Sequence, residues 1–231
     1  AFSEAIFGLG LVALLIAYLP TMYAAWSRRE ENVALLEVRA GQPPSATELI
    51  IRFNRIGGLD QLSALWQDWE VWFANIEESH TSLGPLSFFR SPTPRRSWVT
   101  AAGAVLDAAA LTEAVVDIPR DPRAALCIRA GYMALRAIAR FFNLPFEEHP
   151  DPFDAVSVAR EEFHEACDRM ATAGVPLKED RAQAWRDFAG WRVNYDAVLI
   201  GLAALTMAPE APWSSDRSLR RATRHKRRKR R

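Results

Sequence analysis

Residues 5–27 form an apolar run that constrains the whole chain. No Asp, Glu, Lys or Arg lies between Glu4 and Arg28, a run of 23 residues. As an α-helix this run extends roughly 34 Å, and the hydrocarbon core of a bilayer is about 30 Å thick. We therefore predict a transmembrane helix over residues 1–27. A buried core helix and a cleaved signal peptide are the alternatives, and the lack of a basic segment before the run disfavours the second.

The flanks of this run predict its orientation. Tyr18, Tyr23 and Trp26 gather toward its C-terminal end, and aromatic rings favour the membrane interface. Arg28 and Arg29 follow at once, and basic residues beside a span tend to stay in the cytoplasm. We therefore expect the N-terminus outside the cell and residues 28 onward in the cytoplasm. We also expect Arg28 and Arg29 to contact anionic lipid.

Two glycines, Gly8 and Gly10, lie in the outer half of the run. Small residues let membrane helices approach one another, and a glycine permits a helix to bend. Their spacing is not the small-xxx-small motif, so the pattern is a weak packing signal. Our hypothesis is that the helix bends at these glycines and that the chain forms a homo-oligomer through its membrane helices.

The rest of the sequence predicts an α-helical domain over residues 28–208. Apolar residues recur at helical spacing, and no stretch alternates with period two for long enough to predict a strand. The membrane helix is expected to continue to residue 40, and the later helices to cover 46–56, 59–79, 97–117, 122–143, 158–173 and 180–207. The fold class is therefore all-α, with one membrane helix and a cytosolic helical bundle.

Charge is distributed unevenly along the chain. Residues 217–231 hold ten Lys or Arg and no acid, which leaves residues 1–216 with 19 basic against 28 acidic groups, a net charge of −9. We predict a disordered polybasic tail over residues 209–231, because like charges repel and little there can be buried. In a tethered chain we expect anionic lipid, rather than nucleic acid, to bind this tail. The contacting residues would be Arg227, Arg228, Lys229, Arg230 and Arg231. A tail that folds back on the acidic body is a third interpretation.

The connector over residues 83–96 contains three prolines and ends in basic residues. This composition predicts a loop. A solvated loop is the favoured interpretation, and contact of Arg90, Arg95 and Arg96 with lipid phosphates is the alternative.

Enzymatic motifs are not evident. Glu161, His164 and Cys167 share a helical face, which makes a metal site geometrically conceivable, but a second ligand pair at a recognised spacing is missing. Cys127 and Cys167 are interpreted as core thiols in a reducing compartment. We therefore predict no catalytic, cofactor-binding or metal-binding residues, and we do not expect an enzyme.

Several segments resemble a family of bacterial integral membrane proteins described as potassium-channel-like. The resemblance includes Ala-Gly-Gln-Pro-Pro at 40–44 and Phe-Arg-Ser-Pro at 89–92, and it extends over residues 8–30, 36–45, 69–74, 89–92, 97–109 and 185–196. It implies an inner-membrane protein whose last membrane helix leads into a cytosolic helical domain. The chain lacks the Thr-x-Gly-Tyr-Gly filter that would bind K⁺, so the resemblance places any filter upstream and makes this chain a C-terminal fragment.

Two functions follow as expectations. The first is the C-terminal membrane helix and the cytosolic regulatory or assembly domain of a potassium-channel-like protein. The alternative is a membrane-tethered helical module that binds a protein partner or anionic lipid and conducts no ions.

Overall fold

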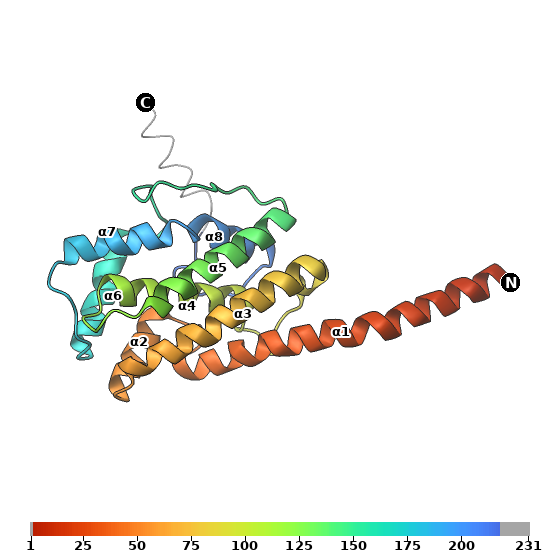
Figure 1. Cartoon of the computed structure of the whole chain (residues 1–231), viewed down its shortest axis with the longest axis horizontal. Coiled ribbons are helices and arrows are strands. Elements are labelled where there is room, and N and C mark those ends of the chain that lie inside the picture. The colour runs from red at the N-terminus through yellow and green to blue at the C-terminus, as the bar shows by residue number, and fades with distance from the viewer. Residues whose placement is uncertain (1, 218–231) are drawn as a thin grey trace, which may run out of the picture.

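One helix occupies nearly all of the first 40 residues. The computed structural model describes residues 2–217, without the side chains of residues 2–6, 14 and 15, and α1 runs unbroken over Phe2–Ala40. Its first half projects from the body as a rod, and its second half packs along the body (Figure 1). The helix ends at Gly41, whose φ of 78° is favourable for glycine and whose N–H donates to Glu37 O at 2.9 Å.

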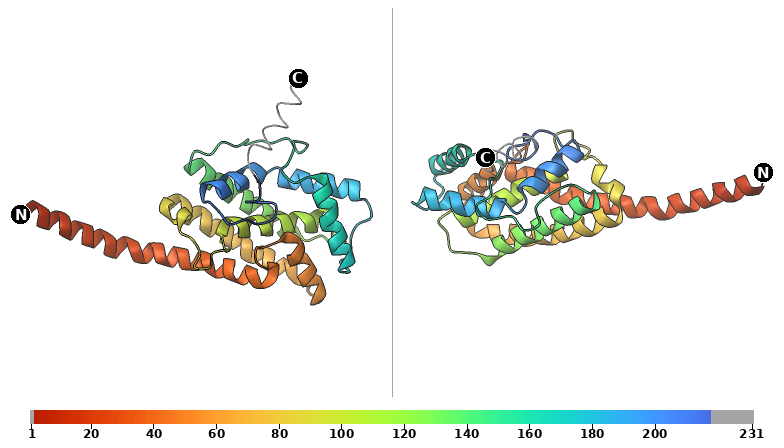
Figure 2. Two further views of the ribbon diagram at one scale, coloured as in Figure 1. Left: turned by 180° about the vertical axis from the view of Figure 1, so that it is seen from behind. Right: turned by 90° about the horizontal axis from the view of Figure 1, so that it is seen from above.

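Seven further α-helices and two short 3₁₀-helices build the body within the described residues. Figures 1 and 2 show them stacked around a central helix, α4. In chain order the helices are α2 (Ala46–Arg55), η1 (Leu59–Gln61), α3 (Leu62–Ser82), η2 (Gly84–Phe88), α4 (Trp98–Ala114), α5 (Pro122–Phe141), α6 (Arg160–Thr172), α7 (Arg181–Arg192) and α8 (Asp196–Leu205). No strand forms among residues 2–217, so the all-α prediction is confirmed for that part of the chain.

Helix α4 lies at the centre because small side chains let its neighbours approach closely. It is buried along almost its whole length and contacts α1, α2, α5, α7 and α8. Gly131 of α5 provides one close approach, because a Cβ there would lie 2.4 Å from Leu106 Cδ2. Because alanine and glycine have small side chains, neighbouring helices can pack close to α4, and one alanine-rich helix contacts five others.

Side-chain N-caps mark the starts of α2 and α5. Ser45 Oγ accepts from Glu48 N at 3.4 Å, and Asp121 Oδ1 accepts from Arg123 N at 3.0 Å. At the start of α6, the Glu162 carboxylate accepts from the N–H of Ala159 at 2.8 Å.

The predicted final helix over residues 180–207 is divided into α7 and α8. Asn194 lies in the break, and its side-chain amide donates to the carbonyl oxygens of Gly190 and Trp191, both at 3.1 Å. A side chain that binds these carbonyls competes with the backbone bonds of a continuing helix. Arg192 Nε donates to Asp196 Oδ1 across the break, at 2.8 Å.

The folded body extends beyond its predicted end at Ala208. Residues 209–217 lie against the body, with Ala211 and Ser214 buried. The Trp213 ring packs 5.6 Å from that of Phe188, and Arg217 forms an ion pair with Glu162 at 2.6 Å. The prediction of a disordered tail is therefore wrong for residues 209–217, because an aromatic ring and a paired arginine anchor them. Residues 218–231 lie outside the described part of the chain.

Candidate functional site

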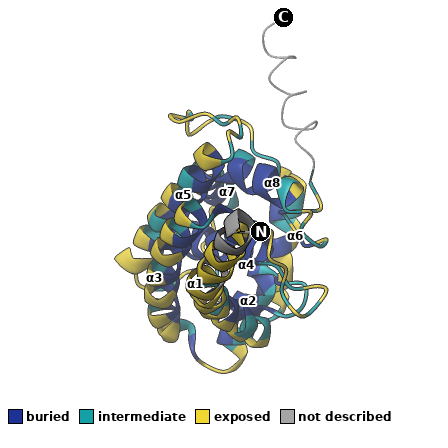
Figure 3. Cartoon of the chain, turned by 90° about the vertical axis from the view of Figure 1, so that its right-hand side faces the viewer, coloured by how far each residue is buried: buried dark blue, intermediate teal, exposed yellow. Residues whose placement is uncertain are grey.

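The projecting half of α1 is the most exposed apolar surface of the described chain. Every described side chain over residues 7–21 is exposed, with Phe7 at 75 % and Ile16 at 69 % (Figure 3). In the described residues this helix is the one long and apolar enough to cross a membrane, and 6 % of its most apolar stretch is buried in the body. A core helix would be mostly buried, so that alternative does not fit.

Gly8 and Gly10 lie within this free segment. A Cβ added at either position would meet no atom within 4 Å. The helix is continuous through both glycines and through Pro20. Both glycines are therefore open to a neighbouring helix, and their predicted role as a bend stays a hypothesis.

Arg29 joins α1 to the body. Its guanidinium is 2 % exposed and donates to Leu86 O at 2.9 Å and to Phe89 O at 2.6 Å. It also pairs with the buried Glu30 at 2.8 Å. The indole N–H of Trp72 donates to the Arg29 carbonyl at 3.2 Å, so α3 holds the backbone of α1 at the same residue.

This geometry corrects one predicted site residue. We expected both arginines after the span to contact lipid, but the Arg29 side chain is enclosed by protein and binds carbonyl groups there. Arg28 is exposed, as a lipid contact requires. The other predicted lipid contacts, Arg227, Arg228, Lys229, Arg230 and Arg231, lie outside the described residues.

His80 of α3 completes the site around Arg29. Its ring is fully buried and packs against Trp98, with the ring centroids 4.7 Å apart. Arginine can only donate, so the His80 Nε2 that lies 3.3 Å from Arg29 Nη1 is the acceptor. Ser79 Oγ donates to Asn75 O at 2.7 Å and is free to accept from His80 Nδ1 at 3.1 Å.

The imidazole is therefore neutral in the folded protein. Burial, and then the charge of Arg29, lower the pKa of His80 from 6.5 to about 3. Arg29 lies 51 residues before His80 in the chain, so no local sequence pattern could reveal this contact.

A second buried ionic group ties α4 to α7 and α8. Arg192 is fully buried, forms an ion pair with Asp107 and binds Asp196 Oδ1 at 2.8 Å. Tyr195 donates its hydroxyl proton to Asp107 at 2.8 Å, and Ser157 donates to Asp196 at 2.6 Å. Burial alone would lower the pKa of Arg192, but the two carboxylates raise it above its ordinary value. Asp107 thus lies in protein, bound by an arginine.

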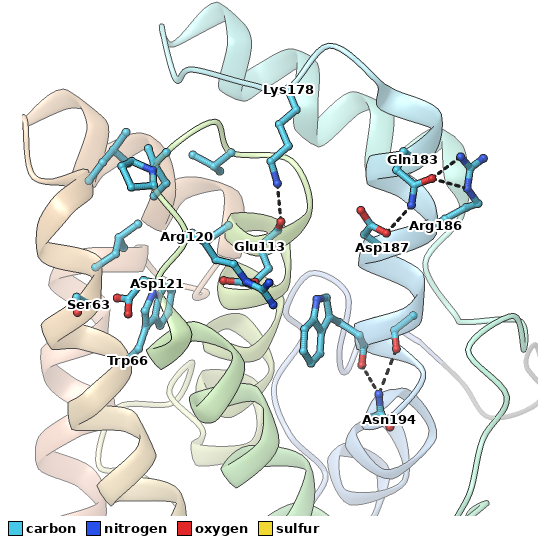
Figure 4. Close-up of a pocket in the computed structure, with 18 of the residues that line it drawn as sticks. Ser63, Trp66, Glu113, Arg120, Asp121, Lys178, Gln183, Arg186, Asp187 and Asn194 are labelled. Atoms are coloured by element: carbon cyan, nitrogen blue, oxygen red, sulfur yellow. Dashed lines mark hydrogen bonds and ion pairs between the residues drawn. The ribbon is translucent and has the colours of Figure 1, made fainter.

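A cleft of about 1250 Å³ lies between α3, the α4–α5 connection and α7 (Figure 4). On its floor, Lys178 Nζ donates to the carbonyl oxygen of Glu113 at 2.7 Å, and Arg120 lies 3.7 Å from the Glu113 carboxylate. Burial raises the pKa of Glu113, and the positive charge of Arg120 lowers it in part. Trp66 and Trp191 add aromatic area to the lining. The cleft thus combines paired charges with aromatic rings, as a polar binding surface does.

The predicted absence of metal ligands and catalytic groups stays a prediction. Among the described residues no three His, Cys, Asp or Glu side chains are grouped to hold a metal ion. His164 Nε2 lies 3.3 Å from Arg160 Nε, and Cys167 is buried. The lining of the cleft, over its described residues, contains neither His nor Cys.

Arg29→Gln should destabilise the folded chain by about 3–5 kcal/mol, because Glu30 would stay buried without its cation and two carbonyl groups would lose their donor. Arg28→Gln is the matched control. It removes the same charge one residue earlier from an exposed position, and should change stability by less than about 0.5 kcal/mol. Equilibrium unfolding in detergent micelles measures both. Equal effects of the two substitutions would contradict the assigned role of Arg29.

The His80 pKa predicts a loss of stability in mild acid. The unfolded chain takes up a proton at this residue below pH 6.5, whereas the folded chain does so only near pH 3. The stabilising contribution is therefore complete above pH 6.5 and declines as the pH falls toward 3. Between pH 7 and pH 5 the loss should be about 2 kcal/mol.

The measurement is the free energy of unfolding at pH 7, 6 and 5 for the parent chain and for His80→Asn. The variant should be less stable at pH 7 and less dependent on pH. Parallel pH dependences would show that His80 titrates alike in both states.

Comparison with protein-family models, with curated proteins and with solved structures finds no match for this chain. The resemblance to potassium-channel-like membrane proteins therefore stays a prediction. Function has to be inferred from the exposed span, the Arg29 site and the cleft.

Proposed function

We propose that this chain is the membrane helix and the cytoplasmic regulatory or assembly domain of a larger, potassium-channel-like protein of the bacterial inner membrane. One observation carries the proposal: α1 is a single helix that is free of protein contacts over its apolar half and anchored in the body over its second half. No flexible linker separates the two halves. A displacement of the span would therefore move the body, and a displacement of the body would move the span.

The direction of the span is inferred from its flanks. Arg28 follows the apolar run and is exposed. The body beyond it carries most of the charged residues and has two buried free thiols, Cys127 and Cys167, which suit a reducing compartment. The N-terminus would then face outward and the body would lie in the cytoplasm.

The free faces of the span support assembly with other membrane helices. Exposed apolar side chains surround α1, and Gly8 and Gly10 leave room for a close neighbour. In the channel interpretation these neighbours are further copies and the helices of an upstream pore, whose filter would bind K⁺. The residues after 217 would add contacts to anionic lipid through their basic groups.

The cleft favours a second candidate function. A hollow of about 1250 Å³ that carries charged groups and two tryptophans suits a bound partner, with or without a pore. In that case the chain is a tethered helical module that conducts no ions. The two functions differ in whether α1 packs against other membrane helices, because a tethered module needs no neighbour in the membrane.

The orientation can be tested with single cysteines. A membrane-impermeant maleimide added to intact spheroplasts should label Ser3→Cys and should not label Glu179→Cys, which lies in an exposed loop of the body. Both should react after the cells are opened. The native thiols are buried and serve as an internal blank. Labelling of Glu179→Cys in intact cells would refute the proposed orientation.

Assembly can be tested by oxidative cross-linking in the same membranes. Cysteines placed one at a time at residues 9, 10, 11 and 12 sample every side of the helix. At least one should form a disulfide-linked dimer if α1 packs against another copy. Ile56→Cys, exposed at the far end of α2, is the control for random collision. No dimer at any of the four positions would favour the tethered module.

A further inference from the structure

The side of the body from which α1 emerges carries an apolar and basic surface. Figure 3 views this side, and Figure 1 shows that α3 and α5 both end there. We call this surface the junction face. It is defined by four apolar and two basic residues: Phe88, Phe89, Phe141, Met207, Arg28 and Arg90.

Ring contacts and a shared hollow bring the apolar residues together from separate parts of the chain. The Phe88 and Phe142 rings lie 5.4 Å apart, and Phe141 packs against Phe142 at 5.0 Å. Met207 lines the same small hollow as Phe88. The segment is fixed to α1, because Trp26 Nε1 donates to Arg90 O at 3.4 Å.

Large apolar side chains are unusually exposed on this face. Phe88 is 48 % exposed, Phe89 42 %, Phe141 47 % and Met207 72 %. Each is anchored by its backbone or by neighbouring rings and still directs much of its area outward. Several aromatic side chains exposed side by side mark an interaction surface.

The length of the span places this face at the level of the bilayer surface. The charge-free run ends at Ser27, and α1 already contacts the body at Met22, which is 3 % exposed. A run of roughly 34 Å exceeds the hydrocarbon core by only a few ångströms. With the span in place, no gap is left between the body and the headgroups. The junction face must then contact them.

The charges on the face suit an anionic surface. Arg28 and Arg90 are exposed, whereas Arg96, farther along the connector, is occupied by an ion pair with Glu37. The hollow next to Phe88 is lined, among described residues, by Arg90, by the paired Arg96 and by no acid. The body as a whole is acidic, so this basic rim is a local feature.

We propose that the junction face rests on the anionic inner leaflet, with Phe88, Phe89, Phe141 and Met207 in the headgroup region and Arg28 and Arg90 against lipid phosphates. Aromatic rings and a thioether fit the boundary between headgroups and acyl chains. The body is thus held at the membrane at two places, by the α1 span and by the junction face. The proposal rests on the proposed function in one respect, namely that α1 spans the membrane.

The test uses nitroxide labels on the full chain in vesicles of phosphatidylcholine and phosphatidylglycerol. Met207→Cys and Ile56→Cys form a matched pair, because both native side chains are 72 % exposed. Collisions with oxygen report a lipid environment, and collisions with a nickel chelate report water. The oxygen-to-nickel ratio should be several-fold higher at residue 207 than at residue 56.

A charge test accompanies it. Arg28→Gln combined with Arg90→Gln should lower the ratio at residue 207, and vesicles of phosphatidylcholine alone should lower it for the parent chain. Arg160→Gln combined with Arg169→Gln, which removes two exposed charges from α6, is the control and should leave the ratio unchanged. A ratio indifferent to both arginines and to phosphatidylglycerol would overturn the anionic-lipid assignment.

A third label separates this proposal from the proposed function. Leu11→Cys lies in the free part of α1, so it should be lipid-exposed if the helix spans. Equal nickel access at residues 207 and 56 with a lipid-exposed residue 11 would overturn the junction face alone. Water exposure at residue 11 would overturn the span. Protection at residue 207 from both collision agents that grows with protein density would indicate a second copy, and would also overturn the proposal. Unchanged circular dichroism verifies the fold of each variant.

Discussion

The burial of Arg29 is the interaction on which the arrangement of the apolar half of α1 and the body depends. An arginine that is 2 % exposed has to be fully bound by acceptors and opposite charge around it, and Glu30, His80 and two carbonyl oxygens of the connector bind it. These partners come from three different parts of the chain. The first turn of α1 after the apolar run is therefore built into the core, and α1 enters the body without a break in the helix.

The packing at the centre of the body also depends on a buried ionic group. An alanine-rich helix such as α4 gains stability from close contact with its neighbours, and Asp107 places a carboxylate in the middle of that contact. Arg192 and Tyr195 bind this carboxylate from the break between α7 and α8. Removal of one partner would leave a buried charge unpaired, which is strongly unfavourable. The network thus selects one packing of the helices.

The sequence predicted the elements with regular spacing and missed the contacts between distant residues. The extension of α1 to Ala40 and the helices predicted over residues 59–79 and 122–143 follow from local patterns, and the structure contains all three. Arg29 was predicted to contact lipid because a basic residue after a span usually does. Its burial depends on carbonyl groups some sixty residues later. The same limit applies to residues 209–217, which Arg217 anchors through Glu162.

The central claim is that α1 is one rigid helix from the apolar span into the body. Spin labels at Leu11→Cys and Val38→Cys, both exposed on α1, measure this directly in vesicles. Their separation of 27 positions in the sequence corresponds to about 40 Å in a continuous helix. A single narrow distance distribution near that value, with allowance for the label arms, is the predicted result. A broad distribution, or a clearly shorter distance, would reveal a hinge at Pro20 or at the membrane surface and would contradict the account.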